Sequence, residues 1–196
     1  MYTVPDPERR LRQINYCLLF LIVAVNLYVF VAPYVAQSYA WTDHYTGAQE
    51  HLLRELNQSE SDKKPNHVII PAMLTDSTIY EGTDARDALN KGIWRWPTSS
   101  TPDKGGNTVL LGTRFSYVKP KSEFYFMDRL QLGSQLGIVW QGKTYHYIVN
   151  AISTPQPNDD SLLAQTATPT VTLYTTTPLI YATKRLAVTA RLETQP

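Results

Sequence analysis

Hydrophobic residues are distributed in two different ways along this chain. Residues 14–35 form one stretch without a charged side chain, INYCLLFLIVAVNLYVFVAPYV. At a rise of about 1.5 Å per residue, roughly 20 such residues cross the hydrocarbon core of a bilayer. Beyond residue 66, the apolar residues instead come in short runs that are separated by Pro, Gly, Asn and Asp. This pattern predicts one membrane helix followed by a β-rich domain.

The charges that flank the long apolar run predict its orientation. Three arginines, at positions 9, 10 and 12, precede it, and no Lys or Arg follows until Arg54. Because positively charged flanks stay in the cytoplasm, we expect a single-pass cell-membrane protein with its N-terminus inside and its C-terminal domain extracellular. A cleaved signal peptide is the alternative, since Ser38-x-Ala40 fits a cleavage site. The run is longer than the roughly 7–15 apolar residues of a signal peptide, so we predict a retained anchor.

The chain therefore divides into four predicted segments. They are a cytoplasmic N-terminus (1–13), a transmembrane helix (14–36), a juxtamembrane helix with a linker (37–65) and a globular domain (66–196). The juxtamembrane helix is expected over residues 41–58, where Leu52, Leu53 and Leu56 fall close together on one helical face. The polar residues 59–65, which end in a proline, are the expected linker.

The globular segment is predicted to contain many short strands and little helix. We expect a helix over 84–90 capped by Thr83, a helical turn or two over 124–130, and a loop over 94–106. Strands are expected over residues 67–70, 77–82, 107–112, 135–140, 143–152, 170–175 and 186–191. Gln141-Gly142, between two of these strands, is a strong hairpin signal. So many short strands with little helix favour a mainly β fold that forms a closed or nearly closed barrel.

Composition narrows the possible functions. The formal net charge is only +1, from 18 basic and 17 acidic residues, so no basic excess points to nucleic acid. The single cysteine, Cys17, lies in the apolar run and cannot form an intrachain disulfide. The four histidines, at positions 44, 51, 67 and 146, lack the spacing of a zinc site, and each is expected to be a surface or structural residue. We therefore predict no metal and no cofactor.

The most specific signal is a short stretch near the C-terminus. Residues 172–178 read Thr-Leu-Tyr-Thr-Thr-Thr-Pro, and Arg185 opens the next strand. Shorter landmarks precede it in order: Ile-Ile-Pro at 69–71, Ile-Tyr-Glu-Gly at 79–82, Ala-Leu-Asn-Lys-Gly at 88–92, Gly-x-Arg at 112–114 and Phe-Tyr-x-Met-Asp at 124–128. This ordered set, behind a membrane anchor, resembles the sortases, cysteine transpeptidases that attach proteins to Gram-positive cell walls and build pili. The resemblance covers residues 66–192 and implies a closed eight-stranded β-barrel with short helices.

Two of the three catalytic groups of that family are replaced here. The sortase motif is Thr-Leu-x-Thr-Cys, and the position of its cysteine is Thr176 in this chain. The family histidine corresponds to Thr113. The family arginine is kept as Arg185. The resemblance assigns these positions the roles of nucleophile, acid–base group and oxyanion stabiliser. Because a threonine nucleophile needs a neighbouring base and Thr113 cannot be one, we expect no competent catalytic residue.

We therefore predict a pseudo-sortase, an anchored extracytoplasmic protein that has lost cysteine transpeptidase activity. Its expected partner is a sorting-signal peptide, a surface protein or an active sortase. The binding groove is predicted to include Thr113, Thr176 and Arg185, together with Trp94 and Trp96, which can contact a peptide through their rings.

Two alternatives remain at this point. One is an active acyl transferase or peptidase of the sortase family, which uses Thr176 with a base brought from elsewhere, such as His146. The other is a purely structural envelope assembly domain. That alternative predicts a closed groove and an Arg185 side chain that pairs within the chain.

Overall fold

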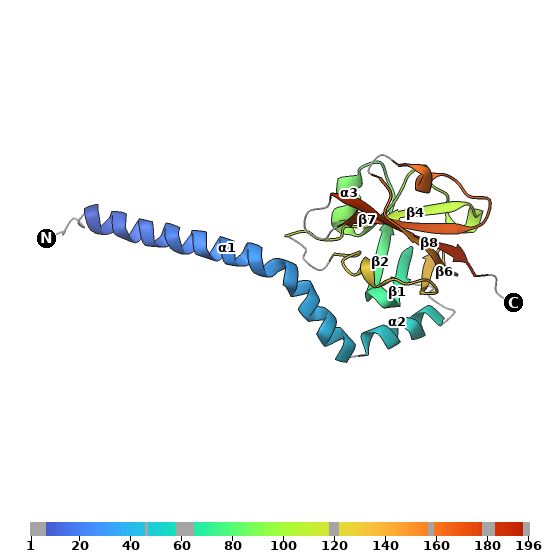
Figure 1. Ribbon diagram of the computed structural model, residues 1–196, viewed down its shortest axis with the longest axis horizontal. Helices are drawn as coiled ribbons and strands as arrows, with labels where there is room; N and C mark the ends of the chain where they lie inside the picture. The colour runs from blue at the N-terminus through green and yellow to red at the C-terminus, as the bar shows by residue number, and fades with distance from the viewer. Residues whose placement is uncertain are drawn as a thin grey trace.

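The computed structural model describes residues 7–45, 47–57, 65–117, 122–156, 159–177 and 183–193. A long helix, α1 (Pro7–Tyr45), extends away from a small barrel, and a second helix, α2 (Ala48–Asn57), turns back beneath that barrel (Figure 1). The predicted linker at 59–65 lies almost wholly outside the described residues.

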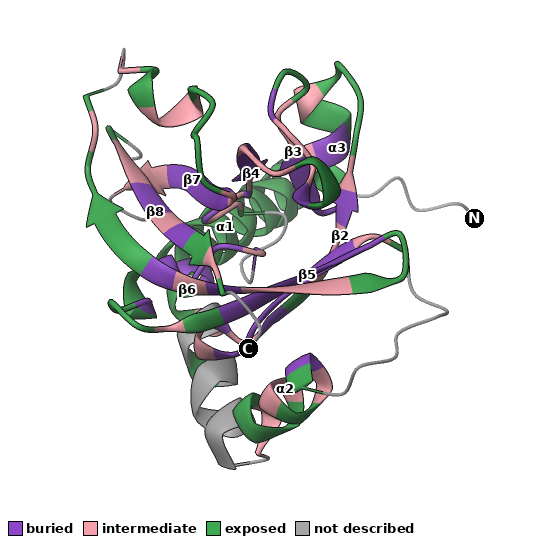
Figure 2. Cartoon of the chain, turned by 90° about the vertical axis from the view of Figure 1, so that its right-hand side faces the viewer, coloured by how far each residue is buried: buried purple, intermediate pink, exposed green. Residues whose placement is uncertain are grey.

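Helix α1 carries the apolar run found in the sequence. Its segment Glu8–Val35 is long and apolar enough to cross a membrane, and only 11% of its most apolar window is buried in the molecule. Most of its large side chains are exposed, as with Phe20 (76%) and Phe30 (78%), and in Figure 2 the ribbon at the α1 label has the green of exposed residues. A continuous apolar surface of this kind marks a membrane or protein contact. Membrane anchors and signal sequences share these features, so retention of the helix stays a prediction.

The helices after the apolar run differ from the predicted ones. Helix α1 continues to Tyr45, and the juxtamembrane helix α2 covers only Ala48–Asn57 within the predicted 41–58. Gly47, at the break, has φ 69°, a backbone conformation that favours glycine. The sequence contains no earlier helix terminator after Pro33, which explains the longer α1.

Eight strands form the barrel. They are β1 (His67–Ile70), β2 (Thr75–Tyr80), β3 (Ile93–Arg95), β4 (Asn107–Leu111), β5 (Gln135–Trp140), β6 (Lys143–Ser153), β7 (Thr170–Thr177) and β8 (Lys184–Leu192). The sheet closes in the order β1-β2-β3-β4-β7-β8-β6-β5, which confirms the predicted closed barrel. Helix α3 (Ala85–Lys91) and four short 3-10 helices, at Pro71–Met73, Pro102–Lys104, Met127–Arg129 and Ser161–Leu163, connect the strands.

Alternation along the strands fills the barrel interior. Leu110, Leu173 and Val188 are cross-strand neighbours on β4, β7 and β8, and all three are fully buried in the main core. Complete burial of such a side chain contributes about 1.5–3 kcal/mol. Because successive side chains of a strand point to opposite faces, the residues on either side of these three face out of the barrel.

Local sequence signals account for some elements and fail for others. Gln141 (φ 50°) and Gly142 (φ 78°) form the predicted turn of the β5–β6 hairpin, since both have the positive φ that this tight turn requires. The expected loop over 94–106 is partly wrong, because β3 occupies Ile93–Arg95. A strand of three residues is too short for a period of two to be recognised.

The predicted cap of the helix over 84–90 is also wrong by one residue. Asp84, and not Thr83, caps helix α3, and its carboxylate accepts hydrogen bonds from the backbone amides of Arg86 (3.0 Å) and Asp87 (3.1 Å). Threonine and aspartate are both good capping residues, so propensity alone does not choose between two adjacent candidates.

Helix α2 packs on the outside of the barrel through a small apolar cluster. Leu56 is 2% exposed and contacts Ile69 and Val139, and Leu52 packs beside them. A Cβ atom at Gly137 would overlap the Leu56 side chain, so the helix can approach β5 this closely only above a glycine. Two of the three leucines predicted to share a helical face therefore attach α2 to the barrel.

Truncation of Leu56 should loosen this attachment. We expect Leu56→Ala to lower the free energy of unfolding by about 2–3 kcal/mol, because it removes the central side chain of a small satellite cluster. Hydrogen exchange in α2 should rise more than exchange in the barrel. Leu132→Ala is the matched control, since Leu132 is 69% exposed and its loss should change stability by less than about 0.5 kcal/mol. Equal effects of the two substitutions would contradict this packing.

Candidate functional site

Strands β7 and β8 place Thr176 beside Arg185. The two residues are direct partners in the antiparallel register, so their side chains leave the same face of the sheet. Tyr174 and Ala187, one step further along the pair, share that face. This face is the outer one, because Leu173 and Val188 point into the core. A hydroxyl, a phenol and a guanidinium thus share one outer surface at the end of the β7–β8 pair.

The segment after β4 lies against the same surface. Strand β4 runs parallel to β7, and the pairing extends one residue past its end, since the Gly112 amide donates to the Tyr174 carbonyl (3.3 Å). The Thr175 hydroxyl in turn donates to the Gly112 carbonyl (2.8 Å). Because Leu111 pairs with Tyr174, continuation of this register brings Thr113 to the level of Thr176. The three predicted positions therefore meet at neighbouring strand ends.

The guanidinium of Arg185 has little recorded contact within the part of the chain that the structure describes. Among the residues that the structure describes, it makes no hydrogen bond and no ion pair, and its recorded contact is with the Tyr174 ring, whose centre lies 5.9 Å from the Arg185 Cζ atom. Burial raises the pKa of the Tyr174 phenol, and the nearby Arg185 charge offsets this only in part. The phenol therefore stays protonated at neutral pH, in a largely buried position beside Arg185.

The two tryptophans lie further along the same sheet and are packed. Trp94 on β3 pairs with Leu111, is 6% exposed, and donates its indole N–H to the Gly82 carbonyl (2.9 Å). Trp96 stacks edge-on against it, with ring centres 5.3 Å apart, and is half-buried. Of the two rings, only that of Trp96 has appreciable surface for contact with a partner.

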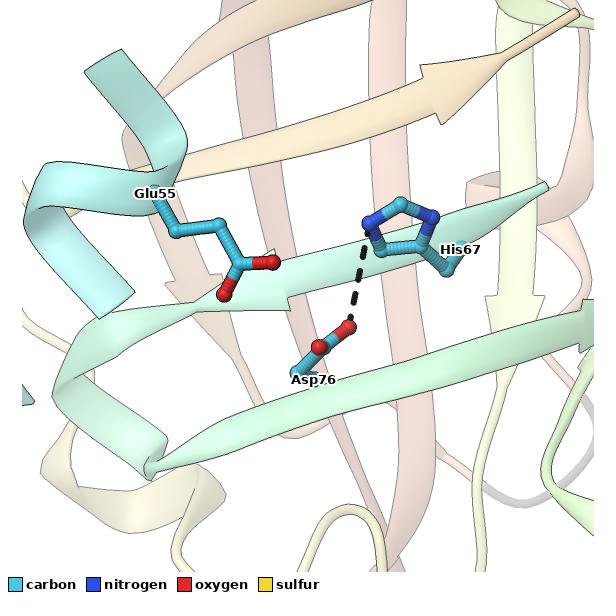
Figure 3. Close-up of side chains that lie close together, drawn as sticks. All are labelled: Glu55, His67 and Asp76. Atoms are coloured by element: carbon cyan, nitrogen blue, oxygen red, sulfur yellow. Dashed lines mark ion pairs between the residues drawn. The ribbon is translucent and has the colours of Figure 1, made fainter. Parts of the chain in front are cut away.

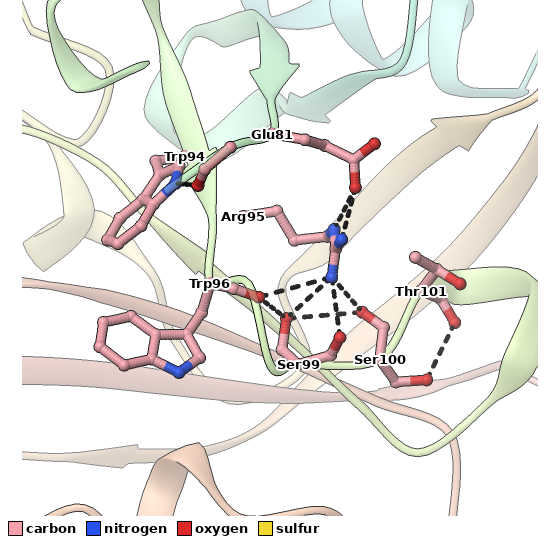
Figure 4. A network of polar contacts seen from close by, with 8 residues as sticks. Glu81, Trp94, Arg95, Trp96, Ser99, Ser100 and Thr101 are labelled. Carbon is pink, nitrogen blue, oxygen red and sulfur yellow. Dashed lines mark hydrogen bonds and ion pairs between the residues drawn. The ribbon is translucent and has the colours of Figure 1, made fainter. Parts of the chain in front are cut away.

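The arginine between the tryptophans also has a packing role. Figure 4 shows the Arg95 guanidinium among loop carbonyls, where it bonds the Glu81 carboxylate (2.7 Å) and the Ser99 carbonyl (2.7 Å). These bonds close the loop after β3 against the barrel. Arg95 therefore holds this loop in place, whereas Arg185 has no comparable bond among the described residues.

Sequence analysis missed a buried arginine beside the candidate groove. Arg114 is 7% exposed, donates to the Thr177 hydroxyl (2.9 Å) and lies 3.1 Å from the Asp128 carboxylate. It ties the segment after β4 to the end of β7. The Gly-x-Arg landmark at 112–114 contained this residue, but sequence alone did not identify its partners.

His146 is too far from Thr176 to act as its base. Its carbonyl accepts a hydrogen bond from the Glu193 amide (2.8 Å), at the far end of β8 from Arg185. Glu193 and Arg185 are eight positions apart (193 − 185), which corresponds to about 26 Å of strand. The version of the enzyme alternative that uses His146 is therefore excluded in this structure.

Fold and site together define a class. The chain is a closed β-barrel protein with three candidate site residues where parallel strands β4 and β7 end, and with an apolar helix at its N-terminus. The Sortase domain family matches residues 68–193. The chain therefore belongs to the sortase family.

Solved structures agree with this assignment. Sortase C1 of GBS (group B Streptococcus) pilus island 1 is 27% identical with a TM-score of 0.61, and the match covers 67% of this chain and 64% of that one. Sortase C-1 from Actinomyces oris is 28% identical with a TM-score of 0.61, covering 68% and 77%. Sortase A from Corynebacterium diphtheriae is 26% identical with a TM-score of 0.61, covering 69% and 63%. No curated protein matches the chain.

The Arg114–Asp128 pair gives a test of the groove's support. Asp128→Asn should lower the free energy of unfolding by about 1–2 kcal/mol, because it leaves a buried cation without its counter-charge. The effect stays below that of a fully buried pair because the Asp128 side chain is 65% exposed. Asp87→Asn is the control, since Asp87 and Lys91 form an exposed pair (2.7 Å) worth less than about 0.5 kcal/mol. Urea denaturation measures both. Equal small losses of unfolding free energy in the two variants would mean that solvent, and not Asp128, balances the charge of Arg114.

Proposed function

We propose that this protein is a membrane-anchored, extracytoplasmic pseudo-sortase that binds a sorting-signal-like peptide at the groove formed by Thr113, Thr176 and Arg185. The observation that carries the proposal is the Arg185 guanidinium. It has no hydrogen bond or ion pair among the described residues, and it lies beside Thr176 on the outer face of the barrel. Arg95 and Arg114, by contrast, each bond neighbouring groups of the fold.

Among the described residues, neither a cysteine nor a histidine lies on the strands that carry Thr176 and Arg185. The only cysteine of the chain is Cys17, in helix α1, and the four histidines lie at positions 44, 51, 67 and 146, none of them on β4, β7 or β8. A thiol with a pKa of about 8.5 supplies some thiolate at neutral pH, whereas an unassisted hydroxyl supplies essentially no alkoxide. Loss of acid–base help alone slows such reactions by about 10²–10⁴-fold. These two losses together support binding without acyl transfer.

The chemistry of the remaining groups suits an extended peptide. A guanidinium presents five donors in a fixed fork that matches a peptide carbonyl or a carboxylate. Thr176 can donate or accept, and the neutral Tyr174 phenol can donate. A free peptide, an exposed segment of a surface protein or a segment of an active sortase all offer such acceptors. Helix α1 would hold the domain at the membrane, with its N-terminal arginines on the cytoplasmic side.

Restoring the family residues tests the proposal directly. The full-length protein in detergent micelles is incubated with a library of sorting-motif peptides and an amine acceptor, beside the Thr113→His/Thr176→Cys double variant. We expect no cleavage or transfer product from the unmodified protein and clear product from the double variant, both followed by mass spectrometry. The peptide that the double variant prefers should also bind the unmodified protein, and Arg185→Met should weaken that binding at least tenfold.

Arg191→Met is the matched control, because Arg191 is an exposed arginine on the same strand. It should leave peptide binding unchanged. Turnover by the unmodified protein would overturn the proposal and make Thr176 a nucleophile. Absence of both turnover and binding in the two proteins would instead favour a structural envelope domain.

A further inference from the structure

Three side chains that can bind a metal meet between α2 and the barrel, away from the groove. Glu55 comes from α2, His67 from β1 and Asp76 from β2, and their ligand atoms all lie within 4.8 Å of one another. Asp76 is the β1–β2 partner of Ile69, which packs against Leu56, so the cluster faces the helix. Figure 3 shows the Glu55 and Asp76 carboxylates directed toward the same edge of the His67 ring.

The orientation of His67 is the decisive observation. The ring is almost fully buried, with 2% exposure, and its Nδ1 lies 2.8 Å from the Pro65 carbonyl oxygen. Because a carbonyl only accepts, Nδ1 carries the proton in this bond, and Nε2 of a neutral ring presents a lone pair. Among the described residues Nε2 has no hydrogen-bond partner, and it lies 3.8 Å from the nearer Asp76 oxygen. A buried lone pair directed at carboxylates is unfavourable unless a cation lies between them.

We propose that Glu55, His67 and Asp76 bind a divalent transition-metal ion of the Zn²⁺ class. One imidazole nitrogen with carboxylate oxygens suits this class, whereas Ca²⁺ and Mg²⁺ prefer oxygen ligands alone. Metal-binding histidines commonly donate their other ring N–H to a backbone carbonyl, as His67 does to Pro65. Tetrahedral zinc bonds of about 2.0–2.1 Å set ligand atoms about 3.4 Å apart. The 3.8 Å between His67 and Asp76 needs only a small contraction.

A fourth ligand is within reach on the same helix. His51 precedes Glu55 by one turn, is exposed, and its Nδ1 lies 4.0 Å from a Glu55 carboxylate oxygen. A rotation of this exposed side chain can bring its ring to the same ion. From the sequence, His51 and His67 are expected to be surface or structural residues. Spacing does not reveal the site, because its four candidate ligands come from α2, β1 and β2.

The ion would fasten the juxtamembrane helix to the barrel. It would connect α2 with β1 and β2, beside the apolar contact of Leu56 on Gly137. Strand β1 lies four strands from β7 in either direction around the barrel, so this site and the groove are on opposite walls. The proposed metal is therefore structural, and it is independent of what the groove binds.

The experiment uses the full-length protein without a polyhistidine tag, in detergent micelles and stripped of metal with EDTA. Calorimetric titration with Zn²⁺ should show one ion per chain, with a rise in the unfolding temperature. Co²⁺ should give the visible absorption of a low-coordinate site. His67→Gln and Asp76→Asn should each weaken Zn²⁺ binding at least tenfold, whereas Glu50→Gln on α2 and His146→Gln on β6 should leave it unchanged.

Absence of Zn²⁺ binding, or binding that survives both His67→Gln and Asp76→Asn, would overturn the proposal. If His67→Gln fails to fold, Glu55→Gln on the partly exposed helix supplies the same readout, and unchanged binding there would count equally against the site. A higher unfolding temperature in mild acid, without any Zn²⁺ binding, would mean that a protonated His67 pairs with the two carboxylates instead of a metal ion. That result would also overturn the proposal.

Discussion

The parallel pairing of β4 with β7 is the constraint on which the candidate site depends. Parallel neighbours end at the same edge of a sheet, so the residues that follow β4 and those that close β7 emerge together. Thr113 and Thr176 are 63 positions apart in the chain (176 − 113), and only this register brings them to one level. The antiparallel return of β8 then adds Arg185 beside Thr176. Three strands therefore assemble a site that no local segment contains.

Alternation separates that site from the core that stabilises it. Leu173 points inward and is fully buried, whereas Thr176 shares the outer face with Tyr174. A change of chemistry at an outward position leaves the packed interior intact, because the two faces of a strand contact different surroundings. The same barrel can thus carry different chemistry at an outward position. For this reason membership of the family establishes the fold, while the groove residues must decide the activity.

The elements predicted from sequence are those with local causes. The β5–β6 turn follows from Gln141-Gly142, and β1 ends where Pro71 follows four buried residues. The features that sequence reasoning missed arise from contacts between distant segments. Arg114 acquires its role only when Thr177 and Asp128 reach it, and His67 meets Asp76 through a strand register. Such partners cannot be deduced from spacing along the chain, because each pair joins segments that are far apart in the sequence.

Contacts at several places join the barrel to the helices that precede it. The Tyr125 hydroxyl donates to the Pro33 carbonyl of α1 (2.6 Å), and Leu56 of α2 packs over Gly137. Tyr125 lies in the connection between β4 and β5, after Thr113 in the chain. Gly137 lies on β5, where it pairs with Ile69 of β1. A body held at two separated points cannot pivot freely about either one. Because the sheet is closed, displacement of α2 also cannot widen the β4–β7 edge without breaking ladder hydrogen bonds. The contacts at Pro33 and Gly137 therefore attach the barrel to both α1 and α2.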